Sequence, residues 1–172
     1  SHEWIFSRSG ISRRHIASPP ETTSYMGTQA ALDALSASGL NADQIDMVIV
    51  ATCTPDAFFP STACVVADNL GATHAIPAFD ISAACSGFLY ALDMAKQYII
   101  SGNAKHIIVV GAETMSKATN WQDRGTCVLF GDGAGAVVVS ASDEQGLIET
   151  VLHAKHDKDG LLRYQNEVSE AI

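Results

Sequence analysis

Two patterns of apolar residues alternate along this chain of 172 residues. Short continuous apolar runs are typical of strands buried on both faces, whereas apolar residues that recur every three or four positions are typical of helices. The runs predict strands at 47–51, 78–81, 107–110, 127–140 and 146–153. The helical spacing predicts helices at about 24–38, 61–70 and 85–100. We therefore expect an α/β fold with a mainly parallel sheet flanked by helices.

Composition narrows the class of protein. Hydrophobic residues make up 47% of the chain and charged residues 17%, which indicates an extensive core in one domain or a large part of one. The formal net charge is −9 and no run of Lys or Arg occurs, so we expect no nucleic-acid partner. No apolar stretch reaches the ~18 residues of a membrane span, so we expect no membrane insertion. The four cysteines lack metal-ligand spacing and nothing signals secretion, which favours reduced thiols, no metal and a cytoplasmic setting.

One cysteine, Cys85, lies where the predicted strand at 78–81 turns into the helix that follows it. Its neighbours Ala84 and Ser86 are small, so a substrate carbonyl could approach the sulfur. Unpaired N–H groups at a helix N-terminus also favour the thiolate over the thiol. Cys85 is therefore a candidate nucleophile, and the alternative is an inert buried cysteine.

Three other stretches carry candidate chemistry. Residues 1–20 place Trp4 among arginines, which could hold a nucleotide or a phosphate, or could form an ordinary surface segment. Phe58 and Phe59 are adjacent loop aromatics that either fill the core or contact a partner or ligand. The run GDGAG at 131–135 lacks the Lys-Ser/Thr of a P-loop, so its glycines imply a close backbone approach or a bulge instead of a phosphate site.

Several segments, taken in order, match one family. They are EWIFSRSGISRRHIA (3–17), FFPSTA (58–63), AFDISAACSGFLYAL (78–92) and DRGTCVLFGDGAGA (123–136). Together they resemble the N-terminal half of a β-ketoacyl-acyl carrier protein synthase III, the condensing enzyme that initiates type II fatty acid synthesis. The resemblance implies a thiolase-like layered fold in which two similar α/β halves form a subunit and two subunits form a homodimer. Residues 1–172 would then be the N-terminal half, without the first strand and the C-terminal half.

The resemblance implies a reaction in which Cys85 matches the acyl-accepting nucleophile. A short acyl group, typically acetyl, passes from acyl-CoA to this cysteine, and a decarboxylative Claisen condensation with malonyl-acyl carrier protein follows. The implied substrates are acyl-CoA and the phosphopantetheine thioester of malonyl-acyl carrier protein, with no bound cofactor and no metal. The implied partners are the acidic acyl carrier protein and a second copy of the chain.

Five further residues gain roles from the resemblance. Trp4 and Arg124 match residues that hold the adenine of coenzyme A, and Arg8 matches a residue near its phosphates. Phe59 matches the dimer-interface aromatic that closes the acyl pocket of the neighbouring subunit. Phe130 lies in the motif beside the active-site tunnel.

The chain departs from the family in what it lacks. The family's catalytic His and Asn, and a glycine that completes its oxyanion hole, lie in the second half, and none of the six histidines here occupies a matching position. The family's first strand, which we expect in the middle of the sheet, is missing as well. We therefore expect the 172 residues alone not to run the whole reaction.

Other functions stay open at this point. A related condensing enzyme could use a different acyl starter, of the alkylquinolone or polyketide type, or could be a hydroxymethylglutaryl-CoA synthase. A non-catalytic scaffold subunit of the same fold would generally lack the cysteine, so Cys85 argues against it. A cysteine hydrolase or redox protein would need an activating base or a CxxC pair, and neither is visible.

Overall fold

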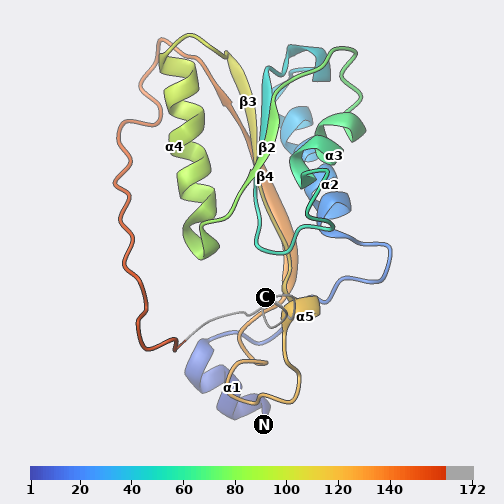
Figure 1. Ribbon diagram of the computed structural model, residues 1–172, viewed down its shortest axis with the longest axis vertical. Helices are drawn as coiled ribbons and strands as arrows, with labels where there is room; N and C mark the ends of the chain where they lie inside the picture. The colour runs from blue at the N-terminus through green and yellow to red at the C-terminus, as the bar shows by residue number, and fades with distance from the viewer. Residues whose placement is uncertain (162–172) are drawn as a thin grey trace, which may run out of the picture.

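The computed structural model describes residues 1–161 of the chain and forms three layers, with a sheet between helices (Figure 1). The helices are α1 (His2–Ser9), α2 (Thr23–Ser38), α3 (Thr62–Asn69), α4 (Gly87–Ile100) and α5 (Met115–Ala118). The strands are β1 (Met47–Ala51), β2 (Ala78–Ile81), β3 (His106–Thr114) and β4 (Asp132–Ser140). Short 3₁₀ turns occur at Ala42–Gln44 and Ala84–Ser86. Within these residues no helix is both long and apolar enough to cross a membrane.

The four strands form one mixed sheet in the order β2-β1-β3-β4. β1 pairs in parallel with both β2 and β3, and β4 runs antiparallel to β3. The predicted mainly parallel sheet flanked by helices is therefore confirmed. The expected central place for a missing strand is wrong, because the four strands are hydrogen-bonded without a gap. A further strand could join this sheet only at the free edge of β2 or of β4.

Alternate residues of β1 face two separate cores, as the geometry of a strand requires. Val48 and Val50 pack with α2 and α3 on one face of the sheet. Met47 and Ile49 pack with α4 on the other face. All five residues of β1 are buried, which is the burial expected for the middle of a parallel sheet. The residues of β2 are half-buried and those of β4 are half-buried or exposed, so these two strands are less covered than β1.

The ends of α2 and α3 follow from the residues that flank them. The side chain of Thr22 accepts a hydrogen bond from the Tyr25 N–H at 3.2 Å, and the side chain of Ser61 accepts one from the Cys64 N–H at 3.2 Å. α2 ends at Gly39, whose φ of 72° is a left-handed conformation that glycine adopts without strain. Both predicted helices are confirmed to within two residues.

Two predicted strand segments take another form. Residues 127–130 form turns, and β4 begins only at Asp132. Residues 146–153 contain no strand and instead lie against α4, where the Ile148 carbonyl accepts a hydrogen bond from Lys96 Nζ at 2.6 Å. Thr150 also donates to the Asp93 carboxylate of α4. This segment is thus held by side-chain contacts with α4 and is not paired in the sheet as predicted.

The first twenty residues contain a helix that the pattern did not predict. α1 runs from His2 to Ser9, is capped by the Ser1 side chain and ends at Gly10, whose φ is 69°. None of its residues is buried, so the segment lies on the surface, where either an ordinary surface role or the binding of a nucleotide or phosphate is open to it. The caps at its two ends define this helix. It has no buried apolar face, so its sequence lacks the periodic pattern that predicts a helix.

Candidate active site

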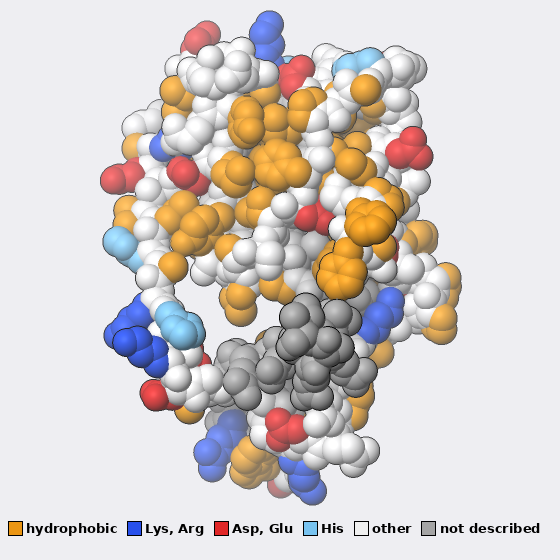
Figure 2. All heavy atoms as spheres, viewed as in Figure 1, with side chains coloured by type: hydrophobic (Ala, Val, Ile, Leu, Met, Phe, Trp, Pro, Cys, Tyr) orange, Lys and Arg blue, Asp and Glu red, His pale blue; other side chains and the backbone are white. Residues whose placement is uncertain are grey.

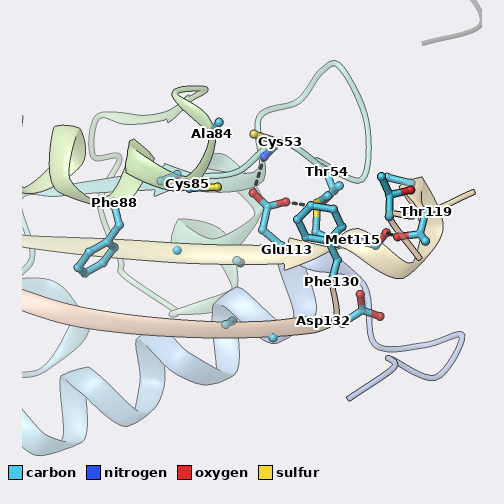
Figure 3. A pocket seen from close by; sticks show the side chains of 18 of the residues that line it. Cys53, Thr54, Ala84, Cys85, Phe88, Glu113, Met115, Thr119, Phe130 and Asp132 are labelled. Carbon is cyan, nitrogen blue, oxygen red and sulfur yellow. Dashed lines mark hydrogen bonds between the residues drawn. The ribbon is translucent and has the colours of Figure 1, made fainter. Parts of the chain in front are cut away.

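The carboxyl ends of β1, β2 and β3 meet at one edge of the sheet, where a cavity of about 1270 Å³ opens. Each of these strands brings a chemically active side chain to the cavity lining: Cys53 after β1, Cys85 after β2 and Glu113 near the end of β3. Figure 3 shows the three side chains around the opening together with Phe130. This edge is where ligands commonly bind in open α/β sheets.

Cys85 lies in the tight turn between β2 and α4. The turn is the 3₁₀ segment Ala84–Ser86, and α4 begins at Gly87, two residues later than the sequence predicts. Ala84 has a φ of 47°, a left-handed conformation that costs a non-glycine residue about 1–2 kcal/mol. A β-carbon at Gly87 would lie 3.2 Å from the Ala51 β-carbon, so the turn packs tightly against the end of β1. Cys85 itself is exposed within the described residues, so its thiol is open to the cavity.

Glu113 ties the loop after β1 to the end of β3. Its carboxylate accepts a hydrogen bond from the Cys53 N–H at 2.7 Å and one from the Thr54 hydroxyl. The Thr52 hydroxyl lies 3.4 Å from the same carboxylate. Bonds to a charged acceptor are the stronger kind, so Glu113 fixes one wall of the cavity.

The same loop is held at its far end by Asp56. The Asp56 carboxylate accepts hydrogen bonds from the N–H groups of Thr23 and Ser24 at 2.9 and 3.1 Å, at the N-terminus of α2. Burial would raise the pKa of Asp56, but hydrogen bonds led by those from Ser24 outweigh it and hold the pKa below its ordinary value. The carboxylate therefore stays ionised and anchors the loop to α2.

Beyond Asp56 the loop presents Phe58 and Phe59 to solvent. Their exposed fractions are 80% and 85%, so the prediction of a core plug is wrong and contact with a partner or ligand stays a prediction. Neither side chain lines the cavity within the described residues.

The predicted coenzyme A residues lie outside the cavity lining. On α1, the Arg8 guanidinium carbon lies 5.2 Å from the centroid of the Trp4 ring, a cation–π contact on the surface of the molecule. Arg124 is exposed in the loop between α5 and β4, which lies at the same end of the molecule as α1 (Figure 1). Lys and Arg side chains flank apolar ones at this end (Figure 2).

The GDGAG run shapes the cavity without forming a phosphate loop. Phe130 and the glycines of the run line the cavity. The predicted close approach occurs at Gly131, where a β-carbon would lie 3.1 Å from the His15 carbonyl oxygen and 3.2 Å from the Arg14 β-carbon. At Gly133 and Gly135 no atom lies within 4 Å of such a β-carbon, so a close backbone approach does not explain these two glycines.

The cavity residues that the sequence reasoning missed include Cys53, Glu113 and Met115. A usable signal existed for two of them, because Cys53 and Glu113 come directly after apolar runs whose carboxyl ends share one edge of a parallel sheet. Met115 starts a four-residue helix that has no periodic pattern to reveal it.

Some groups that chemistry could use are absent from the cavity. None of the six histidines, all of which lie within residues 1–161, contributes to its lining. The described residues also hold no cluster of three or more His, Cys, Asp or Glu side chains arranged for a metal ion. All four cysteines carry free thiols.

A mixed sheet between helices, in this strand arrangement, is the fold of the thiolase-like condensing enzymes, as solved structures confirm. Residues 79–156 match the profile of the family described as 3-oxoacyl-[acyl-carrier-protein (ACP)] synthase III. The β-ketoacyl-[acyl-carrier-protein] synthase III of Thiobacillus denitrificans is 56% identical over 161 residues, which are 94% of this chain and 50% of that protein. The chain is therefore similar to the N-terminal half of β-ketoacyl-acyl carrier protein synthase III enzymes.

Solved structures agree with this similarity. The 3-oxoacyl-[acyl-carrier-protein] synthase III of Aquifex aeolicus VF5 superposes with a TM-score of 0.80 at 56% identity, over 84% of this chain and 46% of that one. The priming β-ketosynthase of the R1128 polyketide biosynthetic pathway superposes with a TM-score of 0.81 at 43% identity, over 85% and 43%. The chain thus spans about half the length of the curated relatives it matches, 50% of the first and 53% of the next.

Proposed function

We propose that the protein containing this chain is a β-ketoacyl-acyl carrier protein synthase III, which condenses a short acyl group with malonyl-acyl carrier protein to initiate fatty acid synthesis. The observation that carries the proposal is Cys85, an exposed thiol in a strained turn at the cavity where three parallel strands end. Strained backbone of this kind clusters at functional sites. The similarity to this family supplies the reaction type.

In the first proposed step the Cys85 thiolate attacks the thioester carbonyl of acyl-CoA. A carbon–sulfur bond to Cys85 forms, the bond to the coenzyme A sulfur breaks, and coenzyme A leaves as a thiolate that takes up a proton. The acyl group then waits on the cysteine, which divides one difficult reaction into two easier ones. The small neighbour Ala84, which also lines the cavity, leaves room for the carbonyl.

In the second proposed step malonyl-acyl carrier protein enters and loses carbon dioxide. The electron pair left on its α-carbon attacks the acyl carbonyl, and the Cys85 thiolate departs to leave a 3-oxoacyl-acyl carrier protein. Each tetrahedral intermediate carries an oxyanion that needs fixed hydrogen-bond donors. The Cys85 N–H is one candidate donor. Because the thioesters themselves activate these carbonyls, the proposed chemistry calls for no bound cofactor and no metal.

The substrates and partners follow the same proposal. Trp4 and Arg124 hold the adenine of coenzyme A, since an aromatic face and a guanidinium plane both stack on a base. Arg8 contributes positive charge near the phosphates. Phe59 contacts a second copy of the chain in a homodimer and closes its acyl pocket, to which Phe130 also contributes. The acidic acyl carrier protein is the second partner, and the setting is the cytoplasm.

A different acyl starter is the second candidate function. The structural similarity to a priming β-ketosynthase of a polyketide pathway supports it. Both readings share the Cys85 chemistry and differ in which acyl group the cavity accepts.

The test is a condensation assay on the full-length protein with malonyl-acyl carrier protein and a series of acyl-CoA substrates. We expect acetyl-CoA to give the highest kcat/KM and Cys85→Ser to abolish product, because a hydroxyl without an activating base is a poor nucleophile. A preference for longer or branched acyl groups would favour the second candidate. Product formation by Cys85→Ser at the rate of the unchanged protein would overturn both.

A further inference from the structure

We infer that Asp132 is a positioning residue that sets the coenzyme A surface by joining the segment after α1 to the loop that carries Arg124. The inference rests on the proposed function, since that function assigns Trp4, Arg8 and Arg124 to coenzyme A. It also explains the GDGAG run, which forms no phosphate loop and takes no part in the Cys85 reaction.

The Asp132 carboxylate accepts hydrogen bonds from two separate segments. Oδ1 accepts from the Ser116 N–H at 2.7 Å, and Oδ2 accepts from the Ser116 hydroxyl at 2.5 Å. Oδ2 also accepts from the Ala17 N–H at 2.8 Å. The Asp132 N–H in turn donates to the His15 carbonyl at 2.8 Å. One residue therefore makes four hydrogen bonds to two parts of the chain that lie about a hundred residues apart in sequence.

The first consequence concerns the loop between α5 and β4. Ser116 lies in α5 before this loop and Asp132 lies directly after it, so their two hydrogen bonds close its base. Arg124 lies within the closed loop, where its backbone neighbours are held by Asp123, which accepts from the Gly125 N–H at 2.9 Å. Breaking the bonds at the base would let the loop and Arg124 shift together.

The second consequence concerns α1, which buries none of its residues and so depends on its connection for its position. That connection is itself well defined, because the Arg14 guanidinium donates to the Ile11 carbonyl at 3.0 Å and to the Ser9 hydroxyl at 3.3 Å. Gly131 lets the connection come close, as the 3.1 Å approach to the His15 carbonyl requires. The path from Trp4 and Arg8 to the rest of the fold thus ends at Asp132.

The charge of Asp132 suits this role. Burial would raise its pKa, but hydrogen bonds led by those from Ser116 outweigh it and keep the pKa below its ordinary value. An ionised carboxylate makes stronger hydrogen bonds than a neutral acceptor. Its oxygens are occupied by protein donors, so Asp132 acts through Trp4, Arg8 and Arg124 and is no catalytic residue.

The decisive variant is Asp132→Asn in the full-length protein, since an amide has nearly the same shape but only one acceptor oxygen and no charge. We expect KM for acetyl-CoA to rise roughly tenfold, as it should with Trp4→Ala, because a hydrogen-bonded charge is lost at the junction. The rate at which enzyme already acylated on Cys85 reacts with malonyl-acyl carrier protein should stay within about threefold. This split separates positioning of the coenzyme A surface from a general loss of structure.

Asp46→Asn is the matched control. Asp46 accepts from the N–H groups of Lys105 and His106 at 2.7 and 2.9 Å, where β1 and β3 begin, at the end of the sheet opposite the cavity. We expect it to lower stability without raising KM for acetyl-CoA. An equal rise in KM for Asp46→Asn and Asp132→Asn would overturn the inference, and so would an unchanged KM in a folded Asp132→Asn protein.

Two further readouts keep the outcome interpretable. If Asp132→Asn loses its near-ultraviolet circular dichroism, Ser116→Ala takes its place; it removes one donor, so KM should rise about threefold, and an unchanged KM would overturn the inference. Coenzyme A binding is measured directly by calorimetry on the unchanged protein. If the unchanged protein neither binds coenzyme A nor acylates Cys85, the proposed function fails; if it binds coenzyme A and Asp132→Asn binds it equally well, only this inference fails.

Discussion

At the scale of single residues, the backbone before Cys85 explains how the thiol reaches the cavity. Ala84 has a φ of 47°, and its side chain is exposed, so the cost of the conformation is a backbone cost that no side-chain contact offsets. The turn aims Cys85 into the cavity while α4 continues behind it. A sequence pattern of small residues indicates room for such a turn but not its conformation.

Substitutions at Ala84 test this strain. We expect Ala84→Val to destabilise the full-length protein by about 1–2 kcal/mol and to slow acylation of Cys85, because a β-branched residue tolerates the left-handed region poorly. Ala84→Gly is the control, since glycine adopts that conformation freely, and its stability should stay close to that of the unchanged protein. Urea unfolding measures both. Equal stability of the Val and Gly variants would contradict the account.

At the scale of elements, three carboxylates add side-chain hydrogen bonds between segments, one of them between strands that the sheet already pairs. Asp46 joins the starts of β1 and β3, Asp56 caps α2, and Asp132 joins α5, β4 and the segment after α1. For each carboxyl group burial raises the pKa, but the hydrogen bonds lower it by more. The pKa of each group in the folded protein therefore lies below its ordinary value. These bonds therefore contribute stability above about pH 4 and lose it as the pH falls through the lowered pKa values.

The lowered pKa of Asp46 gives a prediction for the stability of Asp46→Asn in the full-length protein. At pH 7 the variant should unfold at lower urea concentration than the unchanged protein, because the charged acceptor is lost. Below about pH 4 the difference should shrink, because Asp46 of the unchanged protein becomes protonated and loses the same advantage. Unfolding curves at pH 7, 5 and 3 measure the difference. A difference that stays constant over this range would show that the ionised Asp46 carboxylate is not its source.

The elements that the sequence predicts well are those whose signal is local or periodic. The run Met47–Ala51 is apolar throughout and became the fully buried β1, and the spacing in 24–38 became α2. The failures have physical reasons as well. Residues 127–130 are apolar but lie in turns, because Asp132, which starts β4, is fixed by Ser116 and Ala17, a contact between distant segments that no local pattern records.

The residues of the candidate site also differ in whether a local sequence pattern reveals them. Cys85 could be chosen from its place between a strand and a helix, whereas Phe130 was supplied by the family resemblance, and both line the cavity. The junction at Asp132 could not be predicted, because it depends on hydrogen bonds to residues 16 to more than a hundred positions away. Glu113 had a sequence signal in its place after an apolar run, but its hydrogen bonds to the loop after β1 had none. The family resemblance supplied Trp4, Arg8 and Arg124, and these remain proposals whose test lies in coenzyme A binding.

At the scale of the whole molecule, two groups of exposed large apolar side chains bear on what covers this chain in the full-length protein. Phe58 and Phe59 project from the loop after β1, and Leu89, Ile100 and Ile148 lie on α4 and the segment beside it. Exposed apolar groups of this size mark surfaces that another part of a protein or another subunit covers. We propose that Phe59 meets a second subunit and that the remainder of the full-length protein covers α4.

The proposed dimer contact can be tested by sedimentation of the full-length protein. Phe59→Ala should raise the dimer dissociation constant by roughly tenfold or more, because aromatic anchors contribute most to such interfaces. Phe58→Ala is the matched control, since the neighbouring ring is as large and nearly as exposed, and it should have the smaller effect. A dimer that is unaffected by Phe59→Ala would remove this residue from the interface.

The central claim is that Cys85 carries the acyl group, and acyl mapping tests it most directly. The full-length protein is incubated with labelled acetyl-CoA without malonyl-acyl carrier protein, digested and examined by mass spectrometry. The account predicts one acetyl group per chain, on the peptide that contains Cys85, and release of the label as 3-oxoacyl product when malonyl-acyl carrier protein is added. Label on Cys53, Cys64 or Cys127 with none on Cys85 would contradict the account.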